Sequence, residues 1–550
     1  MKKRAVGSLL SGIAVVGLAG AVALGGALLP SSQLSSAEFR LQPGSAQSAQ
    51  GRMSLVCLGG VERTIQNGVS VESADEKISG ASSAFISGIE PENARTQWEA
   101  FTPVSQNDHS GEQNDKQTND ESTQEAGKAA SAGRRAVSDT SELPGSAVTS
   151  SILTPPQEQH TNLDIPALMG AVSIARGTDG APALIGGSAH TAQAGDLKGL
   201  AYNSCAWPTN AAWYVGSSTR VGNSNRLVVA NPSLTNIQVN VRAFSSTGEV
   251  ALGTSSVVLL PPKSVRAVTL DGLIDEDDSV AFYLSSSAGQ FVATIQTSAL
   301  DGYMPAGVDF ISAGRSGNDL IIPGLVLSAG ELNLGGIEGA TESETSALVD
   351  PKLKARVRLV NPGKENRKAN VFLIDSEGAV KQLPGGDDVE LLAGGVLDLS
   401  LDGVAPGDYS VRVTADGLVA AGAYASYGSD SDGSDIEWLA AQSAITDAGA
   451  YFGLGRGRLV VTPELAGNIT RSAQIEWTAY DSQGKEIGKD TGTIRGTSGI
   501  DMPQGAAYVR LTSDVPVYAA VAGSLDQGIS WAGLSENVSA NSTTHINFEN

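Results

Sequence analysis

Three stretches in the second half of the chain share one strand signature, and this repeat restricts the fold more than any other feature. Arg226–Pro232 has the sequence RLVVANP, Arg356–Pro362 has RVRLVNP, and Arg458–Pro463 has RLVVTP, which lacks the asparagine. An alternation of apolar and polar residues follows each stretch, and a period of two is the pattern of a half-buried β-strand. Its recurrence predicts tandem all-β domains.

A glycine-containing turn ends each alternating segment. Gly248 and Gly378 both lie 17 residues after the asparagine of their copy, and Gly484 lies in the turn of the third copy. Glycine supplies the positive φ that such turns need. About seven short strands in roughly 90 residues, without helical periodicity, predict an all-β protein of three tandem immunoglobulin-like or fibronectin-like β-sandwich domains. We place the three sandwiches at residues 196–314, 315–445 and 446–550.

The N-terminus carries a targeting signal. Basic residues at positions 2–4 precede an uncharged run of 25 residues, Ala5–Leu29, and about 20 residues are enough to cross a bilayer. We therefore expect residues 1–30 to form an uncleaved transmembrane signal anchor, with the bulk of a single-pass protein outside the cell membrane. The string AVA at positions 21–23 resembles a peptidase site, so a cleaved signal and a secreted protein is the alternative.

The composition changes between this anchor and the first predicted sandwich. Residues 31–60 form a polar tether that ends in a short strand at Leu55–Cys57. No Phe, Trp or Tyr occurs from Thr102 to Ala201, and a segment so poor in aromatics cannot bury enough surface to offset its ordering entropy. We expect residues 61–195 to be a mostly disordered, low-complexity excursion, with some strands where apolar residues return at Ile165–Ile185.

Cys57 and Cys205 are the only cysteines of the chain. Two thiols without nearby histidines cannot complete a zinc site. Because disulfides persist outside the cytoplasm, a single Cys57–Cys205 disulfide is the favoured interpretation for an exported chain. It would close the excursion at its base. The alternative is two unrelated buried thiols.

Several strings near Cys205 resemble a known family. They are Gly199–Ala201, Cys205–Pro208, Trp213–Gly216 and the VVANP strand that follows them. The chain is similar, over roughly residues 50–60 and 195–540, to a family of actinobacterial membrane-anchored proteins of unknown function. In that family Pro-Gly follows the early cysteine, whereas Leu58-Gly59 follows Cys57 here. The resemblance implies an envelope location in a high-GC Gram-positive bacterium and a link to envelope glycan synthesis. It implies no catalytic residues.

Charge and motifs exclude several function classes. A formal net charge of -23 argues against nucleic acid as a partner, because phosphate binding needs clustered Lys and Arg. Gly528–Ala532 is the nearest string to a serine nucleophile elbow, and it lacks the second glycine. We expect the four histidines to be solvated, so no triad is predicted. The prediction is a protein that is not an enzyme and uses no cofactor or metal. The four histidines are His109, His160, His190 and His545.

Two acidic loops are candidate calcium sites. The acidic loops at 275–278 and 430–435 would offer oxygen ligands, but Ala441 stands where an EF-hand needs Glu, so solvated loops are favoured. Asp271 and Asp402 stand at matching places before glycine, and a structural turn role is favoured for both.

The tryptophans near Cys205 have two interpretations. Trp207 and Trp213 would either pack in the first sandwich core on the disulfide, which is favoured, or stack on sugar rings.

The predicted function is a non-catalytic extracytoplasmic structural or interaction protein of the bacterial cell envelope, tethered to the membrane and presenting its sandwiches to another envelope protein. The alternative is a carbohydrate-binding module protein that contacts cell-wall or capsular glycan.

Overall fold

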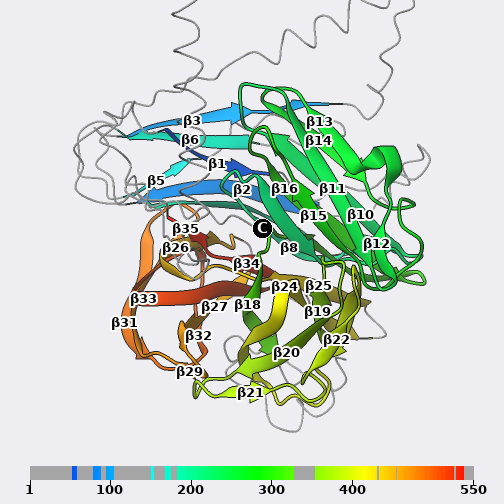
Figure 1. The fold of residues 1–550 in the computed structure, drawn as a ribbon. Helices are drawn as coiled ribbons and strands as arrows, with labels where there is room; N and C mark the ends of the chain where they lie inside the picture. The colour runs from blue at the N-terminus through cyan, green and yellow to red at the C-terminus, as the bar shows by residue number, and fades with distance from the viewer. Residues whose placement is uncertain are drawn as a thin grey trace, which may run out of the picture. The chain divides into compact units, whose positions relative to one another are not determined.

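A computed structural model describes ten segments of the chain. They are residues 52–58, 78–87, 94–104, 150–153, 168–174, 183–327, 354–429, 433–453, 455–525 and 528–537. Strands make up nearly all of the regular structure in these segments, so the all-β prediction is confirmed (Figure 1). The predicted anchor at residues 1–30 lies outside the described residues. Among the described residues, no helix has the length and apolar character needed to cross a membrane.

The N-terminal strands form two antiparallel sheets. One has the order β1 (Arg52–Cys57), β6 (Leu168–Ile174), β3 (Ala94–Ala100), and the other β5 (Ser150–Leu153), β2 (Ile78–Ser87), β7 (Ala183–Ala192), β8 (Gly199–Ser204). Several of these strands lie within residues 61–195, where the sequence predicted mostly disorder. β6 and the start of β7 coincide with the return of apolar residues there. Residues 61–77, 88–93, 105–149, 154–167 and 175–182 lie outside the described residues.

Cys57 and Cys205 form the predicted disulfide. Cys57 ends β1, and Cys205 follows β8, so the bond joins the two N-terminal sheets. Backbone hydrogen bonds run beside it, from the amide of Val56 to the carbonyl of Ala206 at 3.0 Å and from the amide of Ala206 to the carbonyl of Val56 at 2.9 Å. Leu55 and Leu184 pack with both cysteines in a buried cluster. The bond therefore fixes the first described strand to the start of the next part of the chain.

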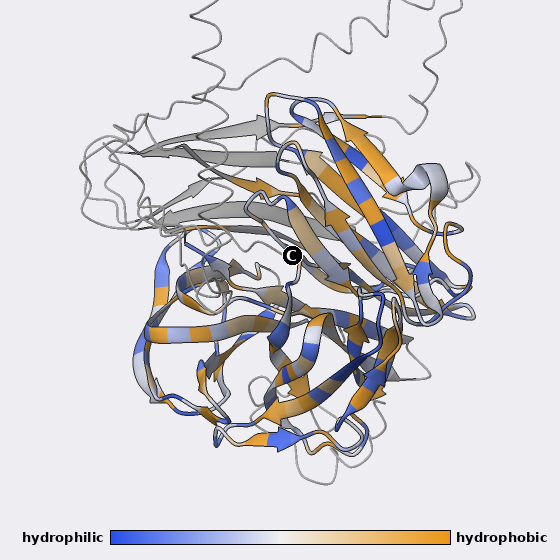
Figure 2. Ribbon diagram, viewed as in Figure 1, coloured by the Kyte–Doolittle hydropathy of each residue, from blue (hydrophilic) through white to orange (hydrophobic). Residues whose placement is uncertain are grey.

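Residues 205–315, the first strand group, form two sheets, and a short strand from earlier in the chain, β4 (Thr102–Pro103), adds a fifth strand to one of them. The first has the order β17 (Met304–Ile311), β16 (Val292–Asp301), β10 (Asn223–Asn231), β14 (Ser264–Thr269), β4. The second has the order β12 (Gly248–Val250), β11 (Ile237–Ser245), β15 (Ala281–Ser285), β9 (Ala211–Val215), with β13 (Val257–Leu260) also on β11. Alternating hydropathy is visible along these strands (Figure 2). In β11 the buried Ile237, Val239 and Val241 alternate with more exposed polar residues.

Residues 316–442, the second strand group, form one eight-stranded sheet around a long strand. Its order is β21 (Val380–Gln382), β20 (Arg367–Ile374), β24 (Gly407–Ser429), β19 (Lys354–Val360), β23 (Val396–Ser400), with β18 (Ser316–Leu327) and β25 (Gly433–Ala440) on β24 and β22 (Val389–Leu391) on β20. The first half of β24 pairs with β20 and its second half with β19. One strand therefore passes from one set of partners to another.

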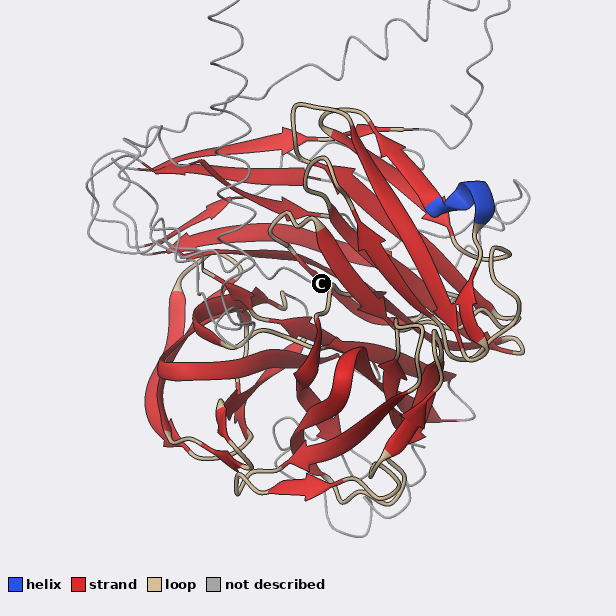
Figure 3. Ribbon diagram, viewed as in Figure 1, coloured by secondary structure: helices blue, strands red, loops and turns tan. Residues whose placement is uncertain are grey.

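Residues 445–537, the third strand group, repeat this plan. The order is β31 (Glu486–Ile494), β30 (Ala473–Asp481), β33 (Ala506–Leu525), β26 (Ile445–Tyr451), β35 (Ser535–Glu536), with β27 (Arg456–Pro463) and β34 (Gly528–Gly533) on β33 and β32 (Ser498–Asp501) on β27. A two-stranded ribbon, β28 (Leu465–Ala466) and β29 (Ile469–Thr470), lies beside them in the chain. Within the described residues one short helical turn, η3 (Gly253–Ser256), interrupts the strands (Figure 3).

The three signature stretches are β10, β19 and β27, and each has equivalent neighbours. β10 lies between β14 and β16, β19 between β23 and β24, and β27 between β32 and β33. The asparagine makes equivalent hydrogen bonds in the two copies that carry it. Nδ2 of Asn231 donates to the carbonyls of residues 235, 260 and 261, and Nδ2 of Asn361 donates to those of residues 365, 391 and 392. A buried amide thus closes the turn after the strand and ties it to a neighbour.

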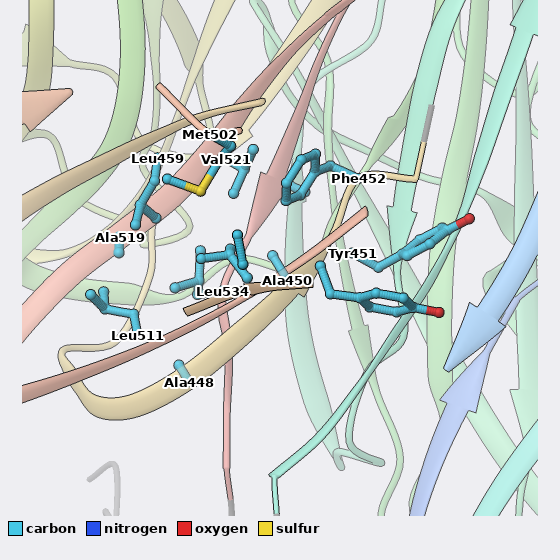
Figure 4. Close-up of a cluster of buried hydrophobic side chains, with 14 of the residues drawn as sticks. Ala448, Ala450, Tyr451, Phe452, Leu459, Met502, Leu511, Ala519, Val521 and Leu534 are labelled. Atoms are coloured by element: carbon cyan, nitrogen blue, oxygen red, sulfur yellow. The ribbon is translucent and has the colours of Figure 1, made fainter. Parts of the chain in front are cut away.

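The apolar cores are shared between parts of the chain. In the third group, side chains of β26, β27 and β33 gather with Phe452, Met502 and Leu534 (Figure 4). Tyr202 of β8 belongs to the same cluster. Trp531 of β34 belongs to the core of the second group, and Trp438 of β25 belongs to the core of the first. Strand groups that exchange aromatic side chains in this way cannot separate without exposing buried surface.

Candidate functional site

Four strands from different parts of the chain meet at one place, which we call the junction. They begin with or contain the related strings GLAY, GVDF, GSDI and GISW, at residues 199–202, 307–310, 433–436 and 528–531. β8 contacts β17 and β34, and β25 contacts β17 and β34, so the four strands close a ring. Figure 1 shows β8 and β34 beside each other. The sequence signal was this fourfold glycine string, which the strand repeat did not reveal.

The carboxylate of Asp435, in β25, connects the other three strands of the junction. Oδ2 of Asp435 accepts hydrogen bonds from the amides of Leu200 at 2.8 Å and Ile529 at 2.9 Å. Oδ1 accepts one from the amide of Val308 at 3.1 Å. The three donors occupy the same place in their strings, directly after the glycine. Asp435 is 2% exposed, so three buried amides depend on one side chain.

The third position of the four strings is buried throughout. It holds Ala201, Asp309, Asp435 and Ser530. Oγ of Ser530 donates to Oδ1 of Asp309 at 3.1 Å and accepts from the amide of Tyr202 at 2.8 Å. Oδ2 of Asp309 accepts from the amide of Trp438 at 2.7 Å. A second set of hydrogen bonds therefore crosses the junction alongside the first.

Glycine at the first position allows this close approach. Gly199 has a φ of 148°, and a side chain there would collide with the carboxylate of Asp435. A Cβ on Gly528 would lie 2.8 Å from the Cβ of Leu200. Because no real Cβ tolerates such distances, the strands can surround Asp435 only if these positions lack side chains.

Burial dominates the electrostatics of the junction. It raises the pKa of Asp435 to about 7, although the hydrogen bonds from the amides act in the opposite direction. Burial, and then the charge of Asp435, raise the pKa of Glu437 to about 8. The pKa of Asp309 lies well above its ordinary value, first because of burial, while the nearby charges of Asp435 and Glu437 act in the same direction. Ionising all three groups at once is therefore costly.

A pocket of about 430 Å³ opens beside Asp435. Gln193 and Lys198 line it from the β7–β8 turn, Ser434 from the start of β25, and Leu525 and Gly528 from the β33–β34 hairpin. The pocket brings polar groups next to the buried carboxylate. The described residues contain no group of three or more His, Cys, Asp or Glu side chains that could hold a metal ion.

The two tryptophans considered for sugar stacking lie in different surroundings. Trp207 is half-buried on the disulfide cluster, and its Nε1 donates to the carbonyl of Glu536 at 2.9 Å. Trp213 is 3% exposed, with its ring centroid 5.2 Å from that of Phe244 and 4.9 Å from that of Tyr283. The ring of Trp213 is enclosed by protein, so it offers no face on which a sugar could stack.

Two polar residues that the sequence placed in water are buried. His190 lies in β7, is 2% exposed, and has an Nε2 atom without a hydrogen-bond partner among the described residues. Burial lowers its pKa to about 4. Asp435 was assigned to a solvated acidic loop and instead forms the centre of the junction. Both assignments were wrong because they rested on local composition, and burial here comes from distant strands. The other three histidines lie outside the described residues.

The remaining acidic positions have structural contacts. Asp271 accepts hydrogen bonds from the amide of Asn225 at 2.9 and 3.0 Å, so its carboxylate has a structural contact with β10 rather than within its own turn. Asp402 makes a different contact, through its own amide to Oγ of Ser400 at 3.1 Å. In the loop at 275–278, Oδ2 of Asp277 accepts from the amide of Ser246 at 2.9 Å. This loop is tied to its neighbours by its own hydrogen bonds.

Comparison with known proteins gives one finding of similarity. Residues 164–503 match the model of a family described as a family of unknown function, DUF5719. No curated protein and no solved structure matches the chain.

Proposed function

We propose a function from the structure itself, because the chain belongs to DUF5719, a family whose function is unknown. We propose a non-catalytic structural or interaction protein of the bacterial cell envelope, anchored by its N-terminal segment, that presents β-sandwiches to another envelope protein. We also propose that the three strand groups are immunoglobulin-like or fibronectin-like sandwiches. The equivalent neighbours of β10, β19 and β27 support that assignment.

The observation that carries the proposal is the way the strand groups are joined. Arg358 of β19 has a fully buried side chain. Its guanidinium donates to both carboxylate oxygens of Asp398 in its own group, at 2.7 and 2.8 Å. It also donates to the carbonyls of Asp278 at 2.7 Å and Val280 at 2.9 Å in the first group. A buried charge therefore bridges two groups, and breaking such a contact costs about 3–5 kcal/mol.

The second and third groups are also joined through buried side chains. Trp531 is 1% exposed in the core of the second group, and its Nε1 donates to the carbonyl of Pro323 at 2.9 Å. A buried chain of hydroxyls crosses nearby, with Oγ of Ser410 2.7 Å from Oγ1 of Thr462, which lies 2.8 Å from Oγ1 of Thr497. Buried polar chains stabilise one arrangement strongly, because a lost partner leaves a desolvated group.

Fixed strand groups suit a protein that binds a partner. A surface assembled from several groups keeps its geometry only when the groups cannot turn against one another. Preorganisation of this kind lowers the entropy lost on association. Charged and aromatic side chains that are buried at group boundaries support a rigid interaction body.

Photocrosslinking in intact cells tests the proposal. A photoreactive residue would replace, one at a time, the exposed Tyr303, Leu392 and Ile469, which are 102%, 60% and 70% exposed. We expect one envelope protein to be captured reproducibly from at least one of these positions. Arg358→Met, which loosens the boundary between the groups, should reduce that capture. A probe at the buried Val241 serves as the negative control.

Two results would count against this function. Gene deletion that leaves envelope assembly unchanged, together with no specific capture from any exposed position, would overturn it. Capture of a glycan in place of a protein would favour the carbohydrate-binding alternative.

A further inference from the structure

Two buried carboxylates accept most of the side-chain hydrogen bonds that cross the junction, and the hydroxyl of Ser530 accepts another from the amide of Tyr202. Asp435 bonds to amides of β8, β17 and β34, and Asp309 of β17 bonds to β25 and β34. Opening the junction would bring these carboxylates into water. The equilibrium between a closed and an open junction must therefore depend on how many protons each form holds.

Other titratable groups surround Asp435 on several sides. Glu437 belongs to the same strand, Tyr424 comes from β24, and Lys198 lines the adjacent pocket. Burial raises the pKa of Tyr424, and the charge of Asp435 acts in the same direction. From β34 the facing residue is Ser530, which does not titrate.

The nearby guanidinium groups lie over aromatic rings. The Cζ of Arg356 is 4.4 Å from the ring centroid of Tyr424, and the Cζ of Arg358 is 4.8 Å from that of Trp438. Both arginines also pair with Asp398. Their charges are therefore engaged elsewhere, and the junction carboxylates rely on amides.

We propose that the junction of β8, β17, β25 and β34 is a pH-sensitive lock, closed in mildly acidic medium and loosened as the medium becomes alkaline. Its parts are the carboxylates of Asp309, Asp435 and Glu437 and the amides that bind Asp309 and Asp435. The pocket beside Asp435 brings solvent to the edge of this buried cluster, so protons can exchange without the strands first separating.

The direction follows from linkage. In the open form these acids have ordinary pKa values of about 4. In the closed form the pKa values of Asp435 and Glu437 are about 7 and about 8. Between these limits the closed form holds more protons, so raising the pH favours opening. Below about pH 4 both forms are protonated, and above about pH 8 both are ionised, so the effect is confined to the interval between.

Hydrogen exchange of the full chain tests the lock. Exchange would be followed by mass spectrometry from pH 5 to pH 9 in peptides that cover the four junction strands, with β11 as an internal reference. After correction for intrinsic exchange, the opening constant of the junction peptides should rise by up to about tenfold per pH unit for each carboxylate that ionises. The opening constant of β11 should stay flat.

Glu437→Gln identifies the groups responsible. Glutamine matches the size of the protonated acid and cannot ionise, so this variant should keep the junction closed and show a shallower rise. Glu377→Gln, in an exposed turn, is the matched control and should keep the wild-type rise. Melting temperatures across the same pH range give a second measurement if peptide coverage is incomplete.

A flat opening constant in the wild type, or equal slopes in wild type and Glu437→Gln, would overturn the lock. Neither result depends on capture of an envelope partner.

Discussion

The molecule contains two charged clusters in which the pKa of a central acid is shifted in opposite directions. At the boundary of the first and second groups, the half-buried Asp398 pairs with the fully buried Arg358. Burial acts to raise the pKa of Asp398, but the hydrogen bonds and charge of Arg358 outweigh it, and the net pKa is lowered. At the junction, burial outweighs the amides, and the pKa of Asp435 is raised. The direction of the pKa shift therefore depends on whether the hydrogen-bond donors are charged. A cation outweighs burial and lowers the pKa, whereas amides alone do not.

This difference fixes the pH range in which each cluster contributes stability. Asp398 has a lowered pKa in the folded protein, so its contribution is present at neutral pH and is lost in acid. Asp435 has a raised pKa, so the closed junction is most stable in acid and weakens as the pH rises through about 7. Both clusters are intact together only in mildly acidic to neutral medium.

The largest expected effect comes from removing the cation. Arg358→Met should lower the free energy of unfolding by about 3–5 kcal/mol, because Asp398 and two carbonyls of the first group would lose the donors of a fully buried guanidinium. Urea denaturation at pH 7 measures this. The matched control is Arg242→Met, which removes an exposed pair. A loss below about 1 kcal/mol in Arg358→Met would contradict the view that this buried pair joins the two groups.

Removing the acid at the junction should cost somewhat less. Asp435→Ala leaves three amides without an acceptor, at about 1–3 kcal/mol each before relaxation, but it also removes a costly buried charge. We expect a net loss of about 3 kcal/mol at pH 5 and a smaller loss at pH 8, where the wild type is already weakened. Urea denaturation at both pH values, with exposed Asp416→Ala as the control, measures the difference. An equal loss at the two pH values would show that the carboxylate does not titrate in the folded protein.

The third expected effect is on how the free energy of unfolding changes with pH in acidic medium. In the wild type, protonating Asp398 below its ordinary pKa should reduce stability by at most about 1.4 kcal/mol per pH unit. In Arg358→Met the same acid keeps only Arg356, at 3.4 Å, so its pKa should lie closer to the ordinary value and its contribution to the slope should shrink. Unfolding followed from pH 3 to pH 6 in both proteins measures the two slopes. Parallel curves would mean that Arg358 does not control this titration.

The smallest effect is expected from an exposed pair. Arg242 and Glu249 are 2.7 Å apart, with side chains 40% and 45% exposed. Arg242→Met should change the free energy of unfolding by less than about 1 kcal/mol, and added salt should reduce even that. A cost equal to that of Arg358→Met would show that pairing alone, independent of burial, sets the energy.

The strands were predictable from sequence, and the junction was not. Alternation and turn glycines are local, so the signature stretches identified β10, β19 and β27 and their turns. Asp435 follows a run of acidic and serine residues that is typical of a solvated loop, and its burial depends on strands 94 to 235 residues away in the chain. His190 is buried for the same reason. Trp213 was correctly favoured as a packed residue, but it packs against Phe244 and Tyr283 and not on the disulfide.

The ring of four strands also sets the order in which synthesis can complete the molecule. The amide of Tyr202 donates to Ser530, a residue 328 positions further along the chain, and the amide of Leu200 donates to Asp435, so neither hydrogen bond can form until its acceptor has been synthesised. Contacts so distant in sequence form slowly. A chain released before β34 would retain β8 with an amide that no acceptor reaches, together with a core that lacks Trp531. The ring of four strands can therefore close only after β34 has been synthesised, although its partner β8 is made more than 300 residues earlier.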